Sequence, residues 1–234
     1  LSICLGRPTA ELTGAVPAGA AGTSAVVVFG SDQGLVGQFN DRLVDYTIDR
    51  LDRLPGDKKI WAMGERIGNR LGEQGLPVVK IYNVPGSIHA VPAFVGRLLV
   101  ESWMSPYFLF FNRPAAGASY EPAFQRMLPL DQQWVQEMTE RAWVTDQLPE
   151  TLGDRLPTLR ALIREYLFVT LFKACVESLA AENTSRLAAM QHAEKNIDNL
   201  LEELERTYHQ ERQKNIDEEL FDIVAGFEAL GKNQ

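Results

Sequence analysis

The longest regular feature of the sequence is a proline-free run from Thr158 to Leu230. Its apolar residues recur at steps of three and four for most of the way, which is typical of an α-helix. At 1.5 Å per residue, such a helix measures on the order of 110 Å, several times the width of a domain built from the preceding residues. The sequence therefore predicts one very long helix, much of which extends beyond the domain.

An apolar stripe runs along this predicted helix. Its large apolar residues are spaced by four and three in alternation, as in the seam of a coiled coil. Nine such side chains left in water would forfeit about 13 to 27 kcal/mol, as much as the net stability of a domain. The stripe therefore needs a partner helix. No second helix of matching length occurs in the sequence, so we expect the partner on a missing part of the polypeptide or on another chain. The predicted seam consists of Met190, Ile197, Leu201, Leu204, Tyr208, Ile216, Leu220, Ile223 and Phe227, and Leu230 continues the spacing.

The residues before the long helix alternate between β-branched or aromatic runs and amphipathic segments. Such alternation predicts an α/β fold, with a mostly parallel sheet of about five strands and covering helices. We divide the chain into a linker (1–23), an α/β domain (24–157, ending in an irregular connector over 131–157) and a shaft helix (158–234). The expected strands are 24–29, 59–63, 78–82, 107–112 and an antiparallel 124–130; the expected helices are 39–53, 65–73 and 91–104.

Composition excludes several classes of protein. The formal net charge of −8 argues against nucleic acid or an anionic membrane surface as the main partner. Cys4 and Cys175 are the only cysteines and lie far apart in the sequence, so a disulfide framework is not expected. No apolar run is long enough to cross a membrane.

A glycine-rich loop, residues 30–37, follows the first strand and precedes a helix, where backbone amides can cradle phosphate. It lacks the Lys and Ser/Thr of a P-loop, because Gln38 and Phe39 follow its last glycine, and it lacks the full dinucleotide spacing. We favour a role in a tight turn and close packing over nucleotide binding. Asp32 is expected to cap a turn rather than to act as a nucleophile or metal ligand.

The remaining reactive side chains suggest no catalytic site. His89, His192 and His209 are scattered and form no metal set. Cys175 lies among apolar residues and is expected to be buried. No catalytic residue, metal or cofactor is predicted.

The apolar stripe is interrupted by a polar belt, residues 209–215. The belt is either a solvated coiled-coil face or a contact with a partner protein, to which Arg212 would offer bidentate hydrogen bonds.

Three stretches resemble the γ subunit of F-type ATP synthases. Residues 30–40 resemble the S-D-[RK]-G-L-C/A-G-x-[LFY]-N segment of that family. Residues 182–196 resemble S-E-x-x-S-R-M-x-A-M-x-x-A-x-x-N, and 212–226 resemble R-Q-x-x-I-T-x-E-[IL]-x-E-I-V-x-G. With 107–130, which is similar to the strand pair ending in L-L-P-L, the resemblance spans about residues 24 to 230.

The resemblance implies a Rossmann-like domain and a central-stalk rotor without an active site, whose shaft helix forms an antiparallel coiled coil with an N-terminal helix absent here. Its implied partners are the α and β subunits, the ε subunit and the c-ring, and no nucleic acid. Its implied place is the cytoplasmic face of a bacterial inner membrane, as a peripheral part of a proton- or sodium-translocating complex. The family's contacts with the β-subunit catch loop would fall on Arg212, Gln213 and Asp217, although Asp217 replaces the family's threonine. This divergence and the acidic shaft suggest an alternative or sodium-type bacterial F-ATPase.

Two other functions remain open from the residues alone. One is a phosphate- or nucleotide-binding α/β enzyme with a coiled-coil dimerisation helix. The other is a scaffold adaptor with no rotary role.

Overall fold

The computed structural model describes residues 22–54, 56–101, 106–116, 119–128, 130, 136–137, 140 and 154–231, with no side chains described at 155 and 225–231. Most of the expected linker (1–23) and connector (131–157) lies outside these residues. Phe227 belongs to a described helix, but its side chain lies outside the described part.

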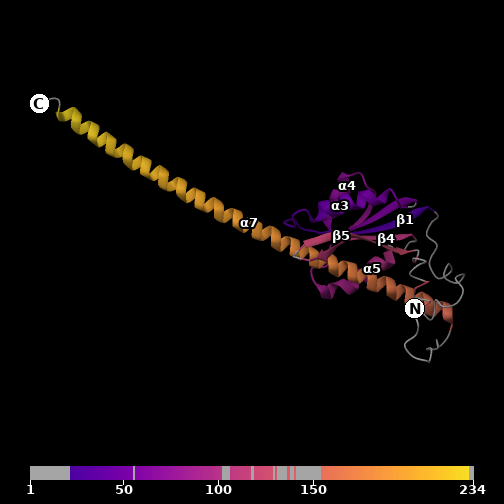
Figure 1. The fold of residues 1–234 in the computed structure, drawn as a ribbon. Helices are drawn as coiled ribbons and strands as arrows, with labels where there is room; N and C mark the ends of the chain where they lie inside the picture. The colour runs from indigo at the N-terminus through magenta and orange to yellow at the C-terminus, as the bar shows by residue number, and fades with distance from the viewer. Residues whose placement is uncertain are drawn as a thin grey trace. The chain divides into compact units, whose positions relative to one another are not determined.

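A five-stranded sheet with the order β3-β2-β1-β4-β5 forms the centre of the domain (Figure 1). The first four strands in this order are parallel, and β5 runs antiparallel to β4. The predicted mostly parallel sheet is confirmed. Every residue of β1 after the first is buried, as expected for a central strand covered on both faces. The strands are β1 (Thr23–Phe29), β2 (Asp57–Met63), β3 (Val78–Tyr82), β4 (Tyr107–Ala115) and β5 (Ser119–Leu128).

The helices cover both faces of the sheet (Figure 1). On one face, α3 (Phe39–Leu51) and α4 (Glu65–Glu73) pack against alternate residues of the strands. On the other face, α5 (Val91–Glu101), preceded by the short η1 (Ile88–Ala90), shares one core with the first part of α7 (Arg155–Gly231).

The helix α7 is continuous over 77 residues, which confirms the prediction of one very long helix. It begins at Arg155 rather than at Thr158, so residues 155–157, expected in the irregular connector, are helical. The reason is that Pro157 stands in the first turn, where a missing N–H costs no intrahelical hydrogen bond.

Contacts divide the chain into two units, residues 1–187 and 188–234. The first contains the sheet with α7 up to Leu187, and the second contains the remainder of α7. Among the described helices, none is long and apolar enough to cross a membrane.

Candidate functional site

The glycine-rich loop is held by packing that leaves no room for a side chain at its start. A Cβ atom at Gly30 would overlap the side chain of Ile67 and would lie 2.7 Å from Oδ1 of Asn40. The backbone N–H of Ser31 donates to Oδ1 of Asn40 (3.1 Å), and Nδ2 of Asn40 donates to the Ser31 hydroxyl (2.8 Å). The preference for close packing over phosphate binding agrees with this geometry, because the first amide after Gly30 is already bonded within the protein.

Asp32 joins three loops at the carboxyl ends of the strands. Its Oδ1 accepts a hydrogen bond from the backbone N–H of Glu65 (3.0 Å), at the start of α4, and its Oδ2 accepts one from Val84 (2.7 Å), after β3. A carboxylate at a helix N-terminus is stabilised by the unpaired amides and the helix dipole. Asp32 thus caps backbone amides, and those amides belong to the two neighbouring loops rather than to its own turn.

The point where the strand order reverses, between β1 and β4, is where ligands usually bind in open α/β sheets. Here α7 fills it. The Ser178 hydroxyl donates to the carbonyl of Phe29, the last residue of β1 (3.1 Å), and the Ser185 hydroxyl donates to the carbonyl of Val36 in the glycine-rich loop (2.6 Å). Ala181, between them, is fully buried in a small cluster with Val36. We call this set of contacts the loop joint.

A buried acid lies within the loop joint. Glu182 is 5% exposed, and its Oε1 accepts a hydrogen bond from Nη2 of Arg186 at 2.6 Å. Burial raises the pKa of Glu182, which the nearby charge of Asp32 also favours, while Arg186 acts in the opposite direction. The bond of Glu182 with Arg186 lies within α7, one helical turn apart, so it stabilises the helix itself.

Cys175 is confirmed as a buried residue, 1% exposed in the core between α7 and the sheet. Burial raises the pKa of its thiol to about 12, so it is not a nucleophile at neutral pH. Among the described residues, no group of three or more His, Cys, Asp or Glu could hold a metal ion.

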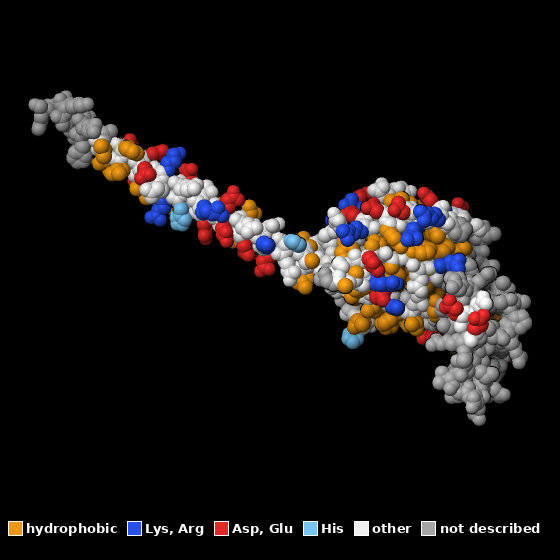
Figure 2. Space-filling model, viewed as in Figure 1, with side chains coloured by type: hydrophobic (Ala, Val, Ile, Leu, Met, Phe, Trp, Pro, Cys, Tyr) orange, Lys and Arg blue, Asp and Glu red, His pale blue; other side chains and the backbone are white. Residues whose placement is uncertain are grey.

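The shaft segment, residues 188–231 of α7, is exposed in its described part, whereas the first part of the helix is buried on one face. Every residue from 191 to 224 is exposed. Figure 2 shows apolar side chains along this segment between acidic ones. The predicted seam residues with described side chains are exposed as follows: Met190 49%, Ile197 57%, Leu201 54%, Leu204 70%, Tyr208 63%, Ile216 48%, Leu220 58% and Ile223 58%.

The stripe changes direction at the polar belt. Leu204 and Ile216 occupy equivalent positions of the 3-4 spacing but are twelve residues apart. At 3.6 residues per turn, this step turns the stripe by about 120°, against a drift of only about 20° per heptad. Tyr208, Arg212 and Ile216 follow one another at steps of four residues. Arg212 therefore lies on the helix face that connects the two apolar parts of the stripe.

The three predicted partner-contact residues are on this belt or just after it. Nε2 of Gln213 donates to Oδ1 of Asp217 at 3.1 Å, one turn apart. In the described part of the chain, Arg212 has neither a hydrogen bond nor an ion pair with another side chain. Its guanidinium is therefore available to an outside acceptor.

The family model of the ATP synthase family matches residues 9–230. The chain belongs to the ATP synthase gamma chain family. It is 24% identical over 229 residues to the ATP synthase gamma chain of Lachnoclostridium phytofermentans, covering 91% of this chain and 76% of that one. It is 28% identical over 217 residues to the gamma chain of Syntrophus aciditrophicus, covering 88% and 73%.

Solved structures show the same fold. The rotor of the Euglena gracilis mitochondrial ATP synthase aligns with a TM-score of 0.61 at 17% identity, over 90% of this chain and 84% of that one. The central stalk and c-ring structure of the Tetrahymena thermophila enzyme aligns with a TM-score of 0.57 at 20% identity, over 82% and 85%.

Family membership confirms the resemblance found in the sequence. The chain is a gamma subunit of an F-type ATP synthase, the central-stalk rotor, and has no active site of its own. The loop joint could not be predicted from the sequence, because its serines donate to backbone carbonyls about 150 residues away in the chain.

Proposed function

We propose that this chain transmits torque between a membrane c-ring and a catalytic hexamer of α and β subunits, with the shaft segment paired to a second, antiparallel helix inside that hexamer. The observation that supports this most directly is the exposed apolar stripe of the shaft segment. A stripe of this length is stable only when other protein covers it.

The first part of α7 would receive torque from the domain. Its buried residues follow one another at steps of four and three along one face and share a core with β1, β4 and α5. A rotation of the sheet about the helix axis would have to break this core as well as the hydrogen bonds of the loop joint. These residues are Leu159, Ile163, Leu167, Leu171 and Ala174.

The shaft segment would deliver the torque. Two supercoiled helices resist bending and twisting, and the faces of the pair differ in charge and shape. A rotating asymmetric surface contacts the three β subunits differently, and so favours a different conformation in each.

The polar belt would supply the bearing contact with a β-subunit catch loop, through Arg212, Gln213 and Asp217. Arg212 has no competing partner in the described part of the chain, so it can form charge-assisted hydrogen bonds with an acidic or carbonyl-lined loop. The bond between Gln213 and Asp217 would orient the amide beside it.

The test uses the chain assembled with its α and β subunits and ε, observed as single rotating molecules. Replacing Arg212 and Gln213 together by Ala removes the charge-assisted hydrogen bonds of Arg212, about 1.5 to 3 kcal/mol each, and the weaker amide bonds of Gln213, so the contact should weaken about tenfold or more. The torque should fall with it. Lys214→Ala is the control, because Lys214 points from a different side of the helix two residues beyond Arg212. Unchanged torque in the double variant would refute the assignment of the belt.

The subunit would reside at the cytoplasmic face of a bacterial inner membrane, held there by the c-ring and ε subunit. The acidic shaft supports the assignment to an alternative or sodium-type bacterial F-ATPase. Rotation that depends on sodium at fixed pH in a reconstituted complex would support the sodium type, and rotation independent of sodium would refute the sodium type.

A further inference from the structure

One buried side-chain oxygen of the domain has no hydrogen-bond donor among the described residues. It is Oδ1 of Asn112, a fully buried residue in the second half of β4. The other end of the same amide is paired, because Nδ2 donates to the carbonyl of Phe39, the first residue of α3, at 3.1 Å. A buried acceptor without a donor costs free energy, and in folded proteins such a group generally bonds to ordered water when no protein donor reaches it.

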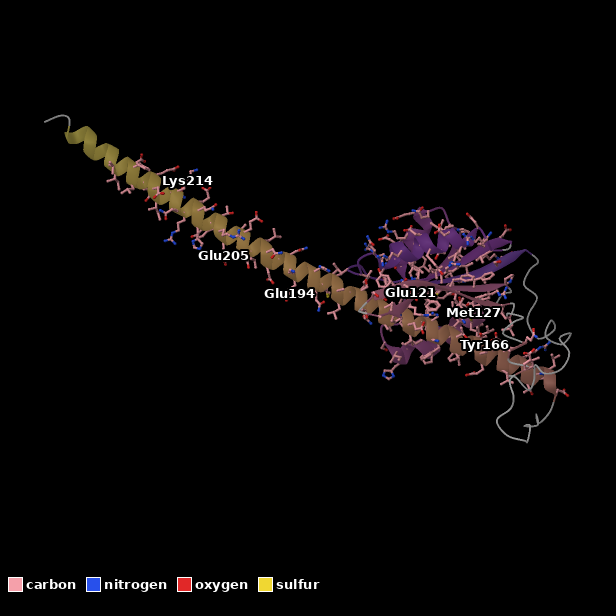
Figure 3. The ribbon with its side chains drawn as sticks, in the orientation of Figure 1. Glu121, Met127, Tyr166, Glu194, Glu205 and Lys214 are labelled. Carbon is pink, nitrogen blue, oxygen red and sulfur yellow. The ribbon has the colours of Figure 1, made fainter. Side chains whose placement is uncertain are left out.

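The orientation of the Asn112 amide is fixed by its neighbour. A flipped amide would place Oδ1 against the carbonyl oxygen of Phe39, and two acceptors would then repel each other. Oδ1 therefore points away from that carbonyl. Phe110, two residues earlier on the same face of β4, belongs to the core beneath α3 and α4, so the unpaired oxygen lies on this side of the sheet. Figure 3 labels Glu121 on β5, which pairs with Arg113 and so marks the neighbouring step of the ladder.

The helix that begins beside Asn112 has no side-chain cap among the described residues. Gln38 stands at the N-cap position, and its side chain makes no capping hydrogen bond. The N–H of Phe39 donates to the carbonyl of Val36 at 3.2 Å, but the other amides of a first turn find no acceptor within their own helix. This end of α3 therefore presents hydrogen-bond donors, while Asn112 presents an acceptor.

We propose that one buried water molecule is bound between Oδ1 of Asn112 and the first turn of α3, donating to the oxygen and accepting from the helix amides. The two sides require a ligand that is both a donor and an acceptor. A cation is disfavoured by the positive end of the helix dipole, and an anion is disfavoured by the amide oxygen. Buried waters of this kind form about three hydrogen bonds each and are costly to remove.

The water completes a chain of hydrogen bonds from β4 to α7. Asn112 donates to the carbonyl of Phe39, and the N–H of Phe39 donates to the carbonyl of Val36. The Ser185 hydroxyl, on α7, donates to that same carbonyl at 2.6 Å. The water thus fixes β4 to the start of α3, next to the loop that the loop joint fixes to α7. This role concerns the folded domain and does not depend on the proposed transmission of torque.

The experiment is a crystal structure of the full chain, alone or assembled with its α, β and ε subunits, at a resolution that shows ordered waters. A water is expected at about 2.5 to 3.0 Å from Oδ1 of Asn112, with a second hydrogen bond from a backbone amide in the first turn of α3. Contact of Oδ1 with apolar atoms alone, or a hydrogen bond to it from a protein donor, would overturn the proposal. A bound ion with several short oxygen contacts would overturn it as well.

Two variants make the test specific. Asn112→Leu keeps a similar volume but loses the bond to Phe39 and the water, so its urea midpoint should fall by about 0.5 M. If Oδ1 were unpaired, the same change would remove a destabilising group, and an unchanged or higher midpoint would overturn the proposal. The matched control is Thr47→Val, at another fully buried polar residue, whose hydroxyl donates to the carbonyl of Leu43 within α3 at 2.6 Å. This control should keep the water, and its loss there would overturn the assignment to Asn112.

Discussion

Removing one hydroxyl from the loop joint should measure how firmly α7 is held against the glycine-rich loop. Ser185 is 8% exposed, and its hydroxyl donates to the Val36 carbonyl at 2.6 Å. Ser185→Ala loses this hydrogen bond, while the Val36 carbonyl keeps its bond from the backbone N–H of Phe39 (3.2 Å), so the loss is that of one hydrogen bond, about 0.5 to 1.5 kcal/mol. The higher helix propensity of alanine offsets about 0.5 kcal/mol of this loss. The free energy of unfolding should therefore fall by up to about 1 kcal/mol.

The neighbouring residue offers a matched control. The hydroxyl of Thr184 donates to the carbonyl of Ala180, within α7 itself. Thr184→Ala loses only this local bond and gains helix propensity, so its free energy of unfolding should stay unchanged or rise by about 0.5 kcal/mol. Urea titrations followed by circular dichroism measure both values, with an unchanged m-value as the check that the unfolding transition is the same.

A third variant tests whether the joint consists of independent contacts. Ser178→Ala removes the other hydroxyl, two turns away, and its effect should add to that of Ser185→Ala because the two sites lie about 10 Å apart and share no partner. Equal stability of the Ser185→Ala and Thr184→Ala variants would refute the conclusion that these hydrogen bonds hold the helix.

The remaining predictions concern burial, pH and the stripe. In a Cys4→Ser background, Cys175 should stay unreactive toward iodoacetamide in the folded chain and react fully in urea, since burial raises the pKa of its thiol to about 12. Rapid labelling of Cys175 in the folded chain would contradict this. Burial likewise raises the pKa of Glu182, so its contribution to stability is greatest when it is protonated and is lost as pH rises from the usual carboxyl value through the raised pKa. In thermal melts, the Glu182→Gln variant should therefore become more stable relative to the wild type as the pH rises through this range. A difference in stability that does not change with pH would refute a raised pKa at Glu182. Leu167→Ala, at a fully buried site, should lower the free energy of unfolding of the isolated chain by about 2 to 5 kcal/mol. Leu204→Ala, at a site 70% exposed, should change it by no more than about 0.5 kcal/mol in the same urea titration. Comparable losses in the two variants would show that the stripe is already covered.

Periodicity alone was enough to predict the main elements. The bounds of α4 and β3 follow directly from the switch between helical and strand spacing in residues 65–82, because local propensity and tertiary burial agree there. The hairpin of β4 and β5 is longer than expected. Residues Pro114 and Ser119 belong to the strands, because pairing across the hairpin overrides the turn preference of proline and serine, and β5 is an edge strand that tolerates Pro122.

The role of Asp32 could not be predicted from its neighbours in sequence. Its two acceptor bonds go to backbone amides 33 and 52 residues away, which only the parallel arrangement of β1, β2 and β3 brings to the same edge. Local rules assign such an aspartate to its own turn. The same limitation applies to Glu182, because nothing in the helical pattern around it distinguishes a buried acid from an exposed one.

The two parts of α7 illustrate the limit of the pattern most clearly. Leu167 and Leu171 are fully buried, while Leu201 and Leu204 are 54% and 70% exposed, although all four belong to the same three- and four-residue spacing. Periodicity says that a face is apolar, but not what covers it. In the first part the chain's own sheet covers that face and also fills the crevice where a related fold would hold a nucleotide. The helix that removes the ligand site therefore continues as the surface on which a partner can act, and this is why a Rossmann-like domain can serve as a mechanical part rather than as an enzyme.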